Sequence, residues 1–141
     1  MEILERNEIE GGLIGSHRTY LCGNLQNPTK ARHIHTDDYE IGISQYSEYT
    51  VEMPHYHSFN IEYNYVISGQ VKVLLLNEGI EKVLKSGDLF VIQTEEPYLC
   101  KAMPNTKVIF SKVPGGNDKV TLQLNENIRR WGESWEKEYE E

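Results

Sequence analysis

Two histidines and a glutamate lie close together in the stretch Met53-Pro54-His55-Tyr56-His57-Ser58-Phe59-Asn60-Ile61-Glu62. Residues two apart on a β-strand face the same side, so His55 and His57 project together. Residues 58–60 allow a turn, after which Glu62 returns on an antiparallel neighbour and can face the same pair. Two imidazoles and one carboxylate with open coordination positions suit iron, manganese, nickel, zinc or cobalt. The spacing predicts a divalent transition-metal site.

The segments around this cluster have the pattern of short strands. From position 39 onward, Ile, Tyr, Thr and Val alternate with polar residues, and turn-forming residues separate the blocks. Many short strands at turn spacing indicate a sandwich or barrel, and the predicted fold class is therefore all-β. We expect strands near 39–48, 49–57, 61–68, 70–76, 80–84, 89–93, 97–103 and 107–113.

The two ends of the chain differ from this core. Residues 2–27 predict a short strand, a glycine turn and an extended arm. Leu124, Ile128, Trp131, Trp135 and Tyr139 fall on one helical stripe. They predict an amphipathic helix over about 125–140, capped by Asn125 or Asn127. We expect its tryptophans to pack on the barrel or across a dimer rather than to bind a ligand.

Composition limits the classes of partner. At 141 residues the chain fits one domain over 1–141, with an arm at 1–38 and a core at about 39–113. A formal charge of −8 disfavours nucleic acid and anionic membranes. No apolar run reaches the roughly 20 residues of a membrane span, so we expect a cytoplasmic protein. Cys22 and Cys100 give no disulfide framework, although a single bridge between them stays open.

The metal-site stretch, read as HxH-x4-E-x6-G and ending at Gly69, resembles the first motif of the cupin superfamily. The resemblance covers the three ligands without a gap, although Tyr49 stands where the family has a glycine six residues before the first histidine. Membership as a small single-domain cupin implies a jelly-roll β-barrel, also called a double-stranded β-helix, with a metal deep in one open end. The resemblance to small cupins also implies that the chain forms a homodimer.

The second cupin motif is matched only in part. Residues 87–92 and Pro97 fit its frame, but Tyr98 occupies the position of the family's ligand histidine. Tyr98 could be the fourth metal ligand, hydrogen-bond a substrate or act as an acid, and we place it with Glu62 as a candidate catalytic residue. Strand alternation also directs Cys100 and Asn64 toward the cavity as candidate ligand- or cofactor-contacting residues.

Alternation also predicts the surroundings of the site. Tyr56, Tyr63 and Tyr65 should face outward, and His33 and His35 should belong to a solvated strand end rather than to a second metal site. The remaining cavity wall is expected from five apolar residues on neighbouring strands: Val51, Met53, Val71, Val73 and Leu75.

Three classes of function are compatible with this pattern. In the first, a metal held by His55, His57 and Glu62 acts on a small polar metabolite, with carbohydrate-type compounds among the candidates. In the second, the barrel is a non-catalytic small-molecule binder or sensor, which the Tyr98 replacement favours. In the third, the barrel is structural and its pocket vestigial. The sequence does not choose between an enzyme and a binder.

Overall fold

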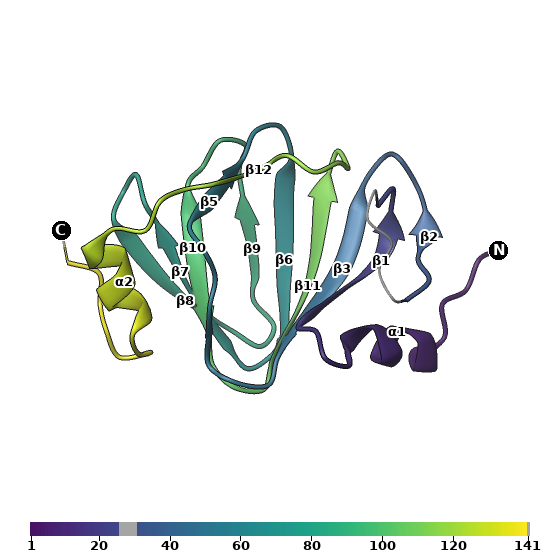
Figure 1. Cartoon of the computed structure of the whole chain (residues 1–141), viewed down its shortest axis with the longest axis horizontal. Coiled ribbons are helices and arrows are strands. Elements are labelled where there is room, and N and C mark those ends of the chain that lie inside the picture. Colours follow the sequence, from purple (N-terminus) through teal and green to yellow (C-terminus); the bar gives the residue numbers. More distant parts are fainter. Residues whose placement is uncertain (26–30, 141) are drawn as a thin grey trace.

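Two sheets face each other in the computed structural model, which describes residues 1–25 and 31–140 (Figure 1). Every strand pairing is antiparallel except the parallel pair β1–β2. The first sheet runs in the order β2 (Ile34–His35), β1 (Arg18–Gly23), β3 (Glu40–Tyr46), β11 (Thr106–Val113), β6 (Ile61–Ser68) and β9 (Leu89–Ile92). The second runs β12 (Lys119–Thr121), β5 (His55–His57), β10 (Tyr98–Ala102), β7 (Gln70–Leu75) and β8 (Ile80–Lys85), with β4 (Thr50–Val51) paired to β10. The predicted all-β jelly-roll fold is confirmed.

An apolar core between the two sheets is made by alternate residues of both sheets. Side chains at directly paired positions face the same way, so the register sets which residues meet. The buried members are Val66, Val71, Val73, Ile92, Tyr98 and Val108. This packing fixes the distance between the sheets and therefore the width of the open end.

Gly69 explains why a glycine ends the first motif. It lies in the turn between β6 and β7 with a φ of 80°, in the left-handed region that L side chains rarely adopt. A Cβ atom at this position would also collide with Thr106. Glycine therefore permits the sharp turn that sends β7 back across the barrel.

The structure divides the predicted strand over 49–57 into two. β4 ends at Val51 and β5 begins at His55, because Pro54 lacks the N–H that a continuous ladder needs. The interruption changes which side chains point inward: Glu52 lines the cavity, whereas Val51 and Met53 are exposed. The prediction that Val51 and Met53 form the cavity wall is therefore wrong.

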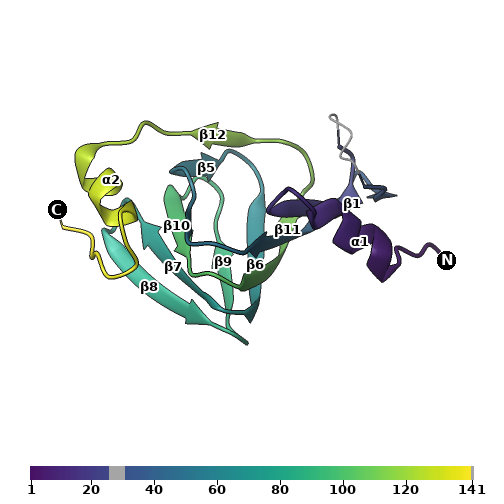
Figure 2. The same cartoon turned by 60° about the horizontal axis from the view of Figure 1, so that its bottom comes forward.

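The C-terminal helix is shorter than expected. Helix α2 (Glu126–Gly132) starts after Asn125, whose side chain accepts a hydrogen bond from the Ile128 N–H at 2.9 Å, as an N-cap should. Trp131 is fully buried against Leu74 and Leu99, so the helix packs on the barrel as predicted (Figure 2). The expectation of a helix continuing to about 140 is wrong.

Lys101 shows what replaces the missing helical turns. Its side chain is completely buried, and its Nζ donates to the carbonyls of Trp131, Ser134 and Lys137 at 2.7, 3.1 and 2.8 Å. A cation at a helix C-terminus satisfies carbonyls that have no intrahelical partner. The chain after Gly132 therefore folds around an ammonium group from the second sheet.

The N-terminal segment also differs from the prediction. Residues expected to form a strand are helix α1 (Arg6–Leu13), and the strand begins only at Arg18. The Glu8 carboxylate accepts from the Glu5 N–H at the helix start and pairs with Arg32 at 2.9 Å. The predicted arm beyond residue 25 lies partly outside the described residues. Within those residues, no helix is long and apolar enough to cross a membrane.

Candidate metal centre

His55, His57 and Glu62 come together at the open end of the barrel. β5, in the second sheet, carries both histidines on its inner face, and β6, in the first sheet, brings Glu62 to the same cavity from the opposite side. The expectation that Glu62 lies on an antiparallel neighbour of the histidine strand is therefore wrong, because the turn after β5 crosses from one sheet to the other. One ligand atom from each residue lies within 4.8 Å of the other two, and all three side chains are buried. These three residues could hold a metal ion, as the spacing predicted.

Fixed tautomers make both histidines suitable ligands. The Nδ1 atom of His55 lies 2.8 Å from the Met53 carbonyl oxygen, and Nδ1 of His57 lies 2.8 Å from Asp118 Oδ1. A carbonyl or carboxylate oxygen only accepts, so the Nδ1 proton donates in each contact and the Nε2 lone pair is left available. A ligating histidine in proteins almost always has such a partner behind it.

The Nε2 atom of His57 is the strongest sign that the cluster fits a cation. This atom is buried and makes no hydrogen bond, although Glu62 Oε2 lies only 2.9 Å away. With the proton on Nδ1, two electron-rich atoms face each other, an unfavourable contact unless a proton or a metal ion lies between them. The donor set of two imidazoles and one carboxylate matches divalent transition metals.

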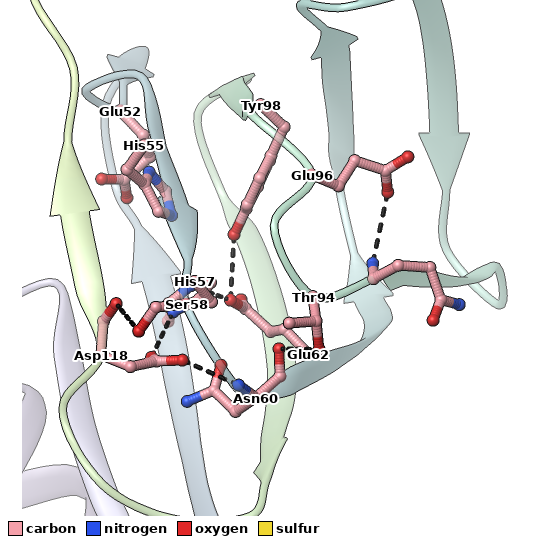
Figure 3. Close-up of polar contacts among 12 residues, drawn as sticks. Glu52, His55, His57, Ser58, Asn60, Glu62, Thr94, Glu96, Tyr98 and Asp118 are labelled. Atoms are coloured by element: carbon pink, nitrogen blue, oxygen red, sulfur yellow. Dashed lines mark hydrogen bonds and ion pairs between the residues drawn. The ribbon is translucent and has the colours of Figure 1, made fainter.

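Asp118 is the positioning residue that sequence reasoning missed. Its Oδ1 accepts from His57, and its Oδ2 accepts from the backbone N–H groups of Phe59 and Asn60, both at 2.8 Å (Figure 3). Asp118 therefore holds the His57 ring and the turn between β5 and β6 together. The segment 114–119 carries only turn signals, so nothing in the sequence pointed to this contact across 61 positions.

Electrostatics keep Glu62 ionised. Burial alone would raise its pKa, but contact with His57 and the charge of Lys112 outweigh burial and lower the pKa of Glu62 to about 2. Burial lowers the pKa of His55 to about 4, so this imidazole is neutral at pH 7. Burial opposes charge on His57 too, but the nearby Glu62 and Asp118 carboxylates raise the pKa of His57. Glu62 therefore provides a carboxylate and His55 a neutral nitrogen.

Tyr98 points at the cluster from β10, directly opposite His55 in the register (Figure 3). Its hydroxyl donates to Glu62 Oε2 at 3.0 Å. Burial, followed by the Glu62 charge, raises the pKa of Tyr98 well above its usual 10, so the phenol is protonated. Tyr98 thus stands beside the predicted ligands as a neutral hydrogen-bond donor, and its ligation of a metal stays a prediction.

Asn64 and Cys100 both line the same cavity, as alternation predicted. Asn64 is 5% exposed, and its Nδ2 atom has no hydrogen-bond partner. Cys22 and Cys100 are free thiols, and burial raises the pKa of Cys100 far enough to keep it protonated. Binding of a ligand or cofactor by these two residues stays a prediction.

The cavity above the cluster is small and lined by charged residues that the sequence analysis did not select. Its volume is about 50 Å³, and its wall includes Arg18, Glu52, Lys112 and Lys119. Alternation over 107–113 places Lys112 on the inward face with Val108 and Phe110, a signal that could have found it. Arg18, Glu52 and Lys119 had no comparable signal because they lie in segments of irregular or short strand structure.

Arg18 belongs to a hydrogen-bonded group on one side of this cavity. Its Nη2 lies 3.4 Å from Glu52 Oε1, and its Nε donates to Ser44 at 3.2 Å. The Tyr46 hydroxyl donates to the same Glu52 oxygen at 2.6 Å. Arg18, Lys112 and Lys119 all line this cavity, and burial followed by the positive charge of Arg18 lowers the pKa of Lys119.

The remaining sequence predictions concern residues away from the cavity. Tyr63 and Tyr65 are exposed on the outer face, and Tyr56 is half-buried outside the cavity lining. His35 is exposed at the edge strand β2, and His33 is not part of any metal-ligating group within the described residues. The histidines outside the first motif thus form no second site there.

Comparisons with known proteins support this fold. No family model matches the chain, and no curated protein matches it. A structure of KdgF from Halomonas sp. is 25% identical, with a TM-score of 0.56 over 72% of this chain and 80% of that chain. An uncharacterized conserved protein with a double-stranded β-helix domain from Klebsiella pneumoniae is 20% identical, with a TM-score of 0.56 over 70% and 81%. The DMSP lyase DddQ from Ruegeria pomeroyi is 13% identical, with a TM-score of 0.58 over 74% and 50%.

The fold and the histidine–glutamate cluster together define a class. The chain is a small cupin, a double-stranded β-helix protein with a short C-terminal helix. Its first motif fits a metal-binding member of that class, and the identity of its substrate is not fixed by the fold.

Proposed function

We propose that this protein is a metal-dependent cupin enzyme that acts on a small polar metabolite. The observation that carries the proposal is the cluster of His55, His57 and Glu62, in which one ligand atom of each lies within 4.8 Å of the others while both histidine Nδ1 atoms are bonded to acceptors that leave Nε2 available. A divalent iron, manganese, nickel, zinc or cobalt ion bound there would act as a Lewis acid toward an oxygen of the metabolite. Structures with the same fold include a nucleoside dehydratase and a DMSP lyase, so the fold accommodates catalysis.

The protein's own residues supply the other functions of the proposed site. Tyr98 holds a proton on its hydroxyl oxygen, 3.0 Å from Glu62, and would donate it to a bound metabolite. Asp118 keeps the His57 ring in one orientation, and Asn64 offers an amide donor to the metabolite. The cavity volume of about 50 Å³ admits only one end of a sugar-sized molecule, so a carbohydrate would enter by its terminal group.

Metal analysis tests the first half of this proposal. Protein purified without added metal should contain a transition metal, and His57→Gln should abolish it because one lone pair is lost. The control is His33→Gln, which removes a histidine outside the cluster. Absence of metal from the wild-type protein, together with no thermal stabilisation by any of the five ions, would contradict the proposal.

Turnover tests the second half. Hydroxy-carbonyl compounds incubated with the metal-loaded protein in D₂O should exchange hydrogen or be converted, as followed by proton NMR. Tyr98→Phe removes only the hydroxyl and should slow turnover by about 10²- to 10⁴-fold while metal content is retained. An unchanged rate in this variant would exclude Tyr98 as the proton donor.

One observation favours the second candidate, a non-catalytic binding protein. The pKa of Tyr98 is raised well above 10 by burial and by Glu62, which makes the phenol a weak acid at neutral pH. A binder would retain its ligand unchanged through purification, whereas an enzyme would release a product. Native mass spectrometry of the purified protein, before and after denaturation, separates the two candidates.

A homodimer is the partner arrangement that we propose. The outer face of the first sheet exposes five apolar side chains on neighbouring strands, namely Tyr63, Tyr65, Ile67, Leu89 and Ile109. No acidic residue of β6, β9 or β11 is exposed on this face, so two copies of an acidic chain can approach there without like-charge repulsion. Light scattering should give twice 16.4 kDa, and Tyr65→Lys should reduce the mass to that of one chain.

A further inference from the structure

Two lysines, Lys112 and Lys119, flank the metal cluster. Lys112 lies opposite Glu62 in the β11–β6 register, and Lys119 lies opposite His57 in the β12–β5 register. Paired positions place side chains on the same face of a sheet, so both lysines lie beside cluster residues at the cavity. Among residues 1–25 and 31–140, neither ammonium has a carboxylate within 4.0 Å. The Lys112 ammonium lies over the rings of Tyr20 and Phe110, at 5.9 and 5.6 Å from their centroids.

The third cation of the cavity is held differently. Arg18 is committed to Glu52 and Ser44, so its guanidinium is fixed as part of the wall. Three cationic side chains line the cavity against two carboxylates, although the whole chain carries a formal charge of −8. A third acid, Asp118, is already bonded to His57 and to two backbone N–H groups. The cavity lining therefore has one more cation than carboxylate, in a chain whose net charge is negative.

Asn64 adds an independent sign of a ligand on the same wall. Only 5% of Asn64 is exposed, and the residue lines the cavity. Its Nδ2 donor has no hydrogen-bond partner among the described residues. A buried amide donor that bonds to nothing costs free energy unless an acceptor occupies the site. Lys112 is diagonal to Asn64 across the β6–β11 pair, and Lys119 lines the same cavity from the other sheet.

The small cavity limits which anion fits. At about 50 Å³ it has room for only a few atoms. A planar carboxylate is a small oxyanion group, whereas a tetrahedral phosphate is larger.

We propose that Lys112, Lys119 and Asn64 form a carboxylate-recognition subsite, so that the metabolite of this cupin is a small carboxylic acid whose carboxylate lies beside the metal cluster. This inference rests on the proposed function because it uses the same cavity. Two ammonium donors and one amide donor match the acceptor oxygens of one carboxylate. Neutral sugars and alcohols of the same size are discriminated against because they leave both ammonium groups unpaired.

Glycolate and its uncharged amide, glycolamide, are matched probes for this subsite. Their binding to metal-free and metal-loaded protein is measured by thermal shift at constant ionic strength, with inorganic phosphate as a third probe. We expect glycolate to bind at least tenfold more tightly than glycolamide or phosphate. Lys112→Met/Lys119→Met should abolish the preference, and Asn64→Asp should weaken glycolate binding by placing a carboxylate against it.

The control is Lys82→Met/Lys85→Met, which removes two exposed lysines of β8 and so makes the same change in net charge. This variant should keep the preference for glycolate. Equal binding of glycolate and glycolamide, or a preference that survives in the cavity double variant, would overturn the inference. Tighter binding of phosphate would overturn the assignment to a carboxylate. If the double variant does not fold, the single variants Lys112→Met and Lys119→Met should each weaken glycolate binding by about tenfold, and unchanged binding in both overturns the inference.

The metal-free arm separates this inference from the proposed function. Glycolate preference in a protein that binds no transition metal would contradict the metal-dependent enzyme and support the carboxylate subsite. Stoichiometric metal binding without any preference for glycolate would support the metal-dependent enzyme and contradict the carboxylate subsite.

Discussion

Asp118→Asn separates the role of Asp118 in metal binding from its role in folding. The carboxylate accepts three hydrogen bonds of 2.8 Å, one from His57 through Oδ1 and two from backbone N–H groups through Oδ2. An asparagine of the same shape has only one acceptor oxygen. If that oxygen stays with the backbone pair, the new NH₂ group faces the Nδ1–H of His57, which places donor against donor.

The His57 ring can relieve this conflict by moving its proton. Nδ1 then accepts from the asparagine, and Nε2 carries the proton toward Glu62, which lies 2.9 Å away. The fold keeps nearly all its hydrogen bonds, so the free energy of unfolding should fall by only about 1–2 kcal/mol. The lone pair needed for a metal is lost, and metal affinity should fall by about 10- to 100-fold.

Isothermal titration with Zn²⁺ or Ni²⁺ measures the affinity, and urea unfolding of the metal-free protein measures stability. The control is Asp88→Asn, a carboxylate that accepts from the Lys85 N–H in the turn between β8 and β9 and does not line the cavity. It should leave the metal affinity unchanged. A metal affinity of Asp118→Asn within threefold of wild type would refute the tautomer argument.

Three further predictions concern the same framework. In metal-free protein, burial lowers the pKa of His55 to about 4, so between pH 6.5 and 4 the unfolded chain binds a proton that the folded protein does not. The free energy of unfolding should therefore fall by about 3 kcal/mol on acidification through this range, and urea unfolding of His55→Gln should not show this loss. Gly42→Ala would press a Cβ against the Phe110 ring and should cost about 1–3 kcal/mol, whereas Gly11→Ala, with nothing within 4 Å, should be neutral or stabilising in thermal unfolding. Lys101→Met would leave three carbonyls without their donor and should cost about 2–4 kcal/mol, with a change in tryptophan fluorescence as the C-terminal segment detaches; an unaltered spectrum and stability would contradict this role.

The sequence determined the barrel strands because their alternation is strong. Residues 61–68 and 107–113 show period-two patterns between clear turn signals, and the structure places β6 and β11 there. The HxH and glutamate spacing predicted the metal cluster because His55 and His57 share one face of a strand and only a short turn separates them from Glu62, although that turn leads into the opposite sheet.

Local patterns failed where distant groups decide the conformation. α2 ends at Gly132, and the carbonyls of Trp131, Ser134 and Lys137 accept hydrogen bonds from Lys101 of β10 rather than from amides of a longer helix. α1 formed where glycines suggested a turn, with Glu8 satisfying its first turn and holding Arg32. Pro54 could be seen in the sequence, but its effect on the inward placement of Glu52 depended on the β4–β10 and β5–β10 pairings.

The sequence by itself determined the ligand types of this protein, two imidazoles and one carboxylate, together with the barrel strands that carry them. Only the tertiary structure decided how those ligands are oriented and what surrounds them. Because β12 pairs with β5, Lys119 lies opposite His57, and Asp118, the residue before it, accepts a hydrogen bond from the His57 ring. Such pairing between segments far apart in the chain leaves no local period in the sequence, and it sets the tautomer of His57 and the charge of the cavity.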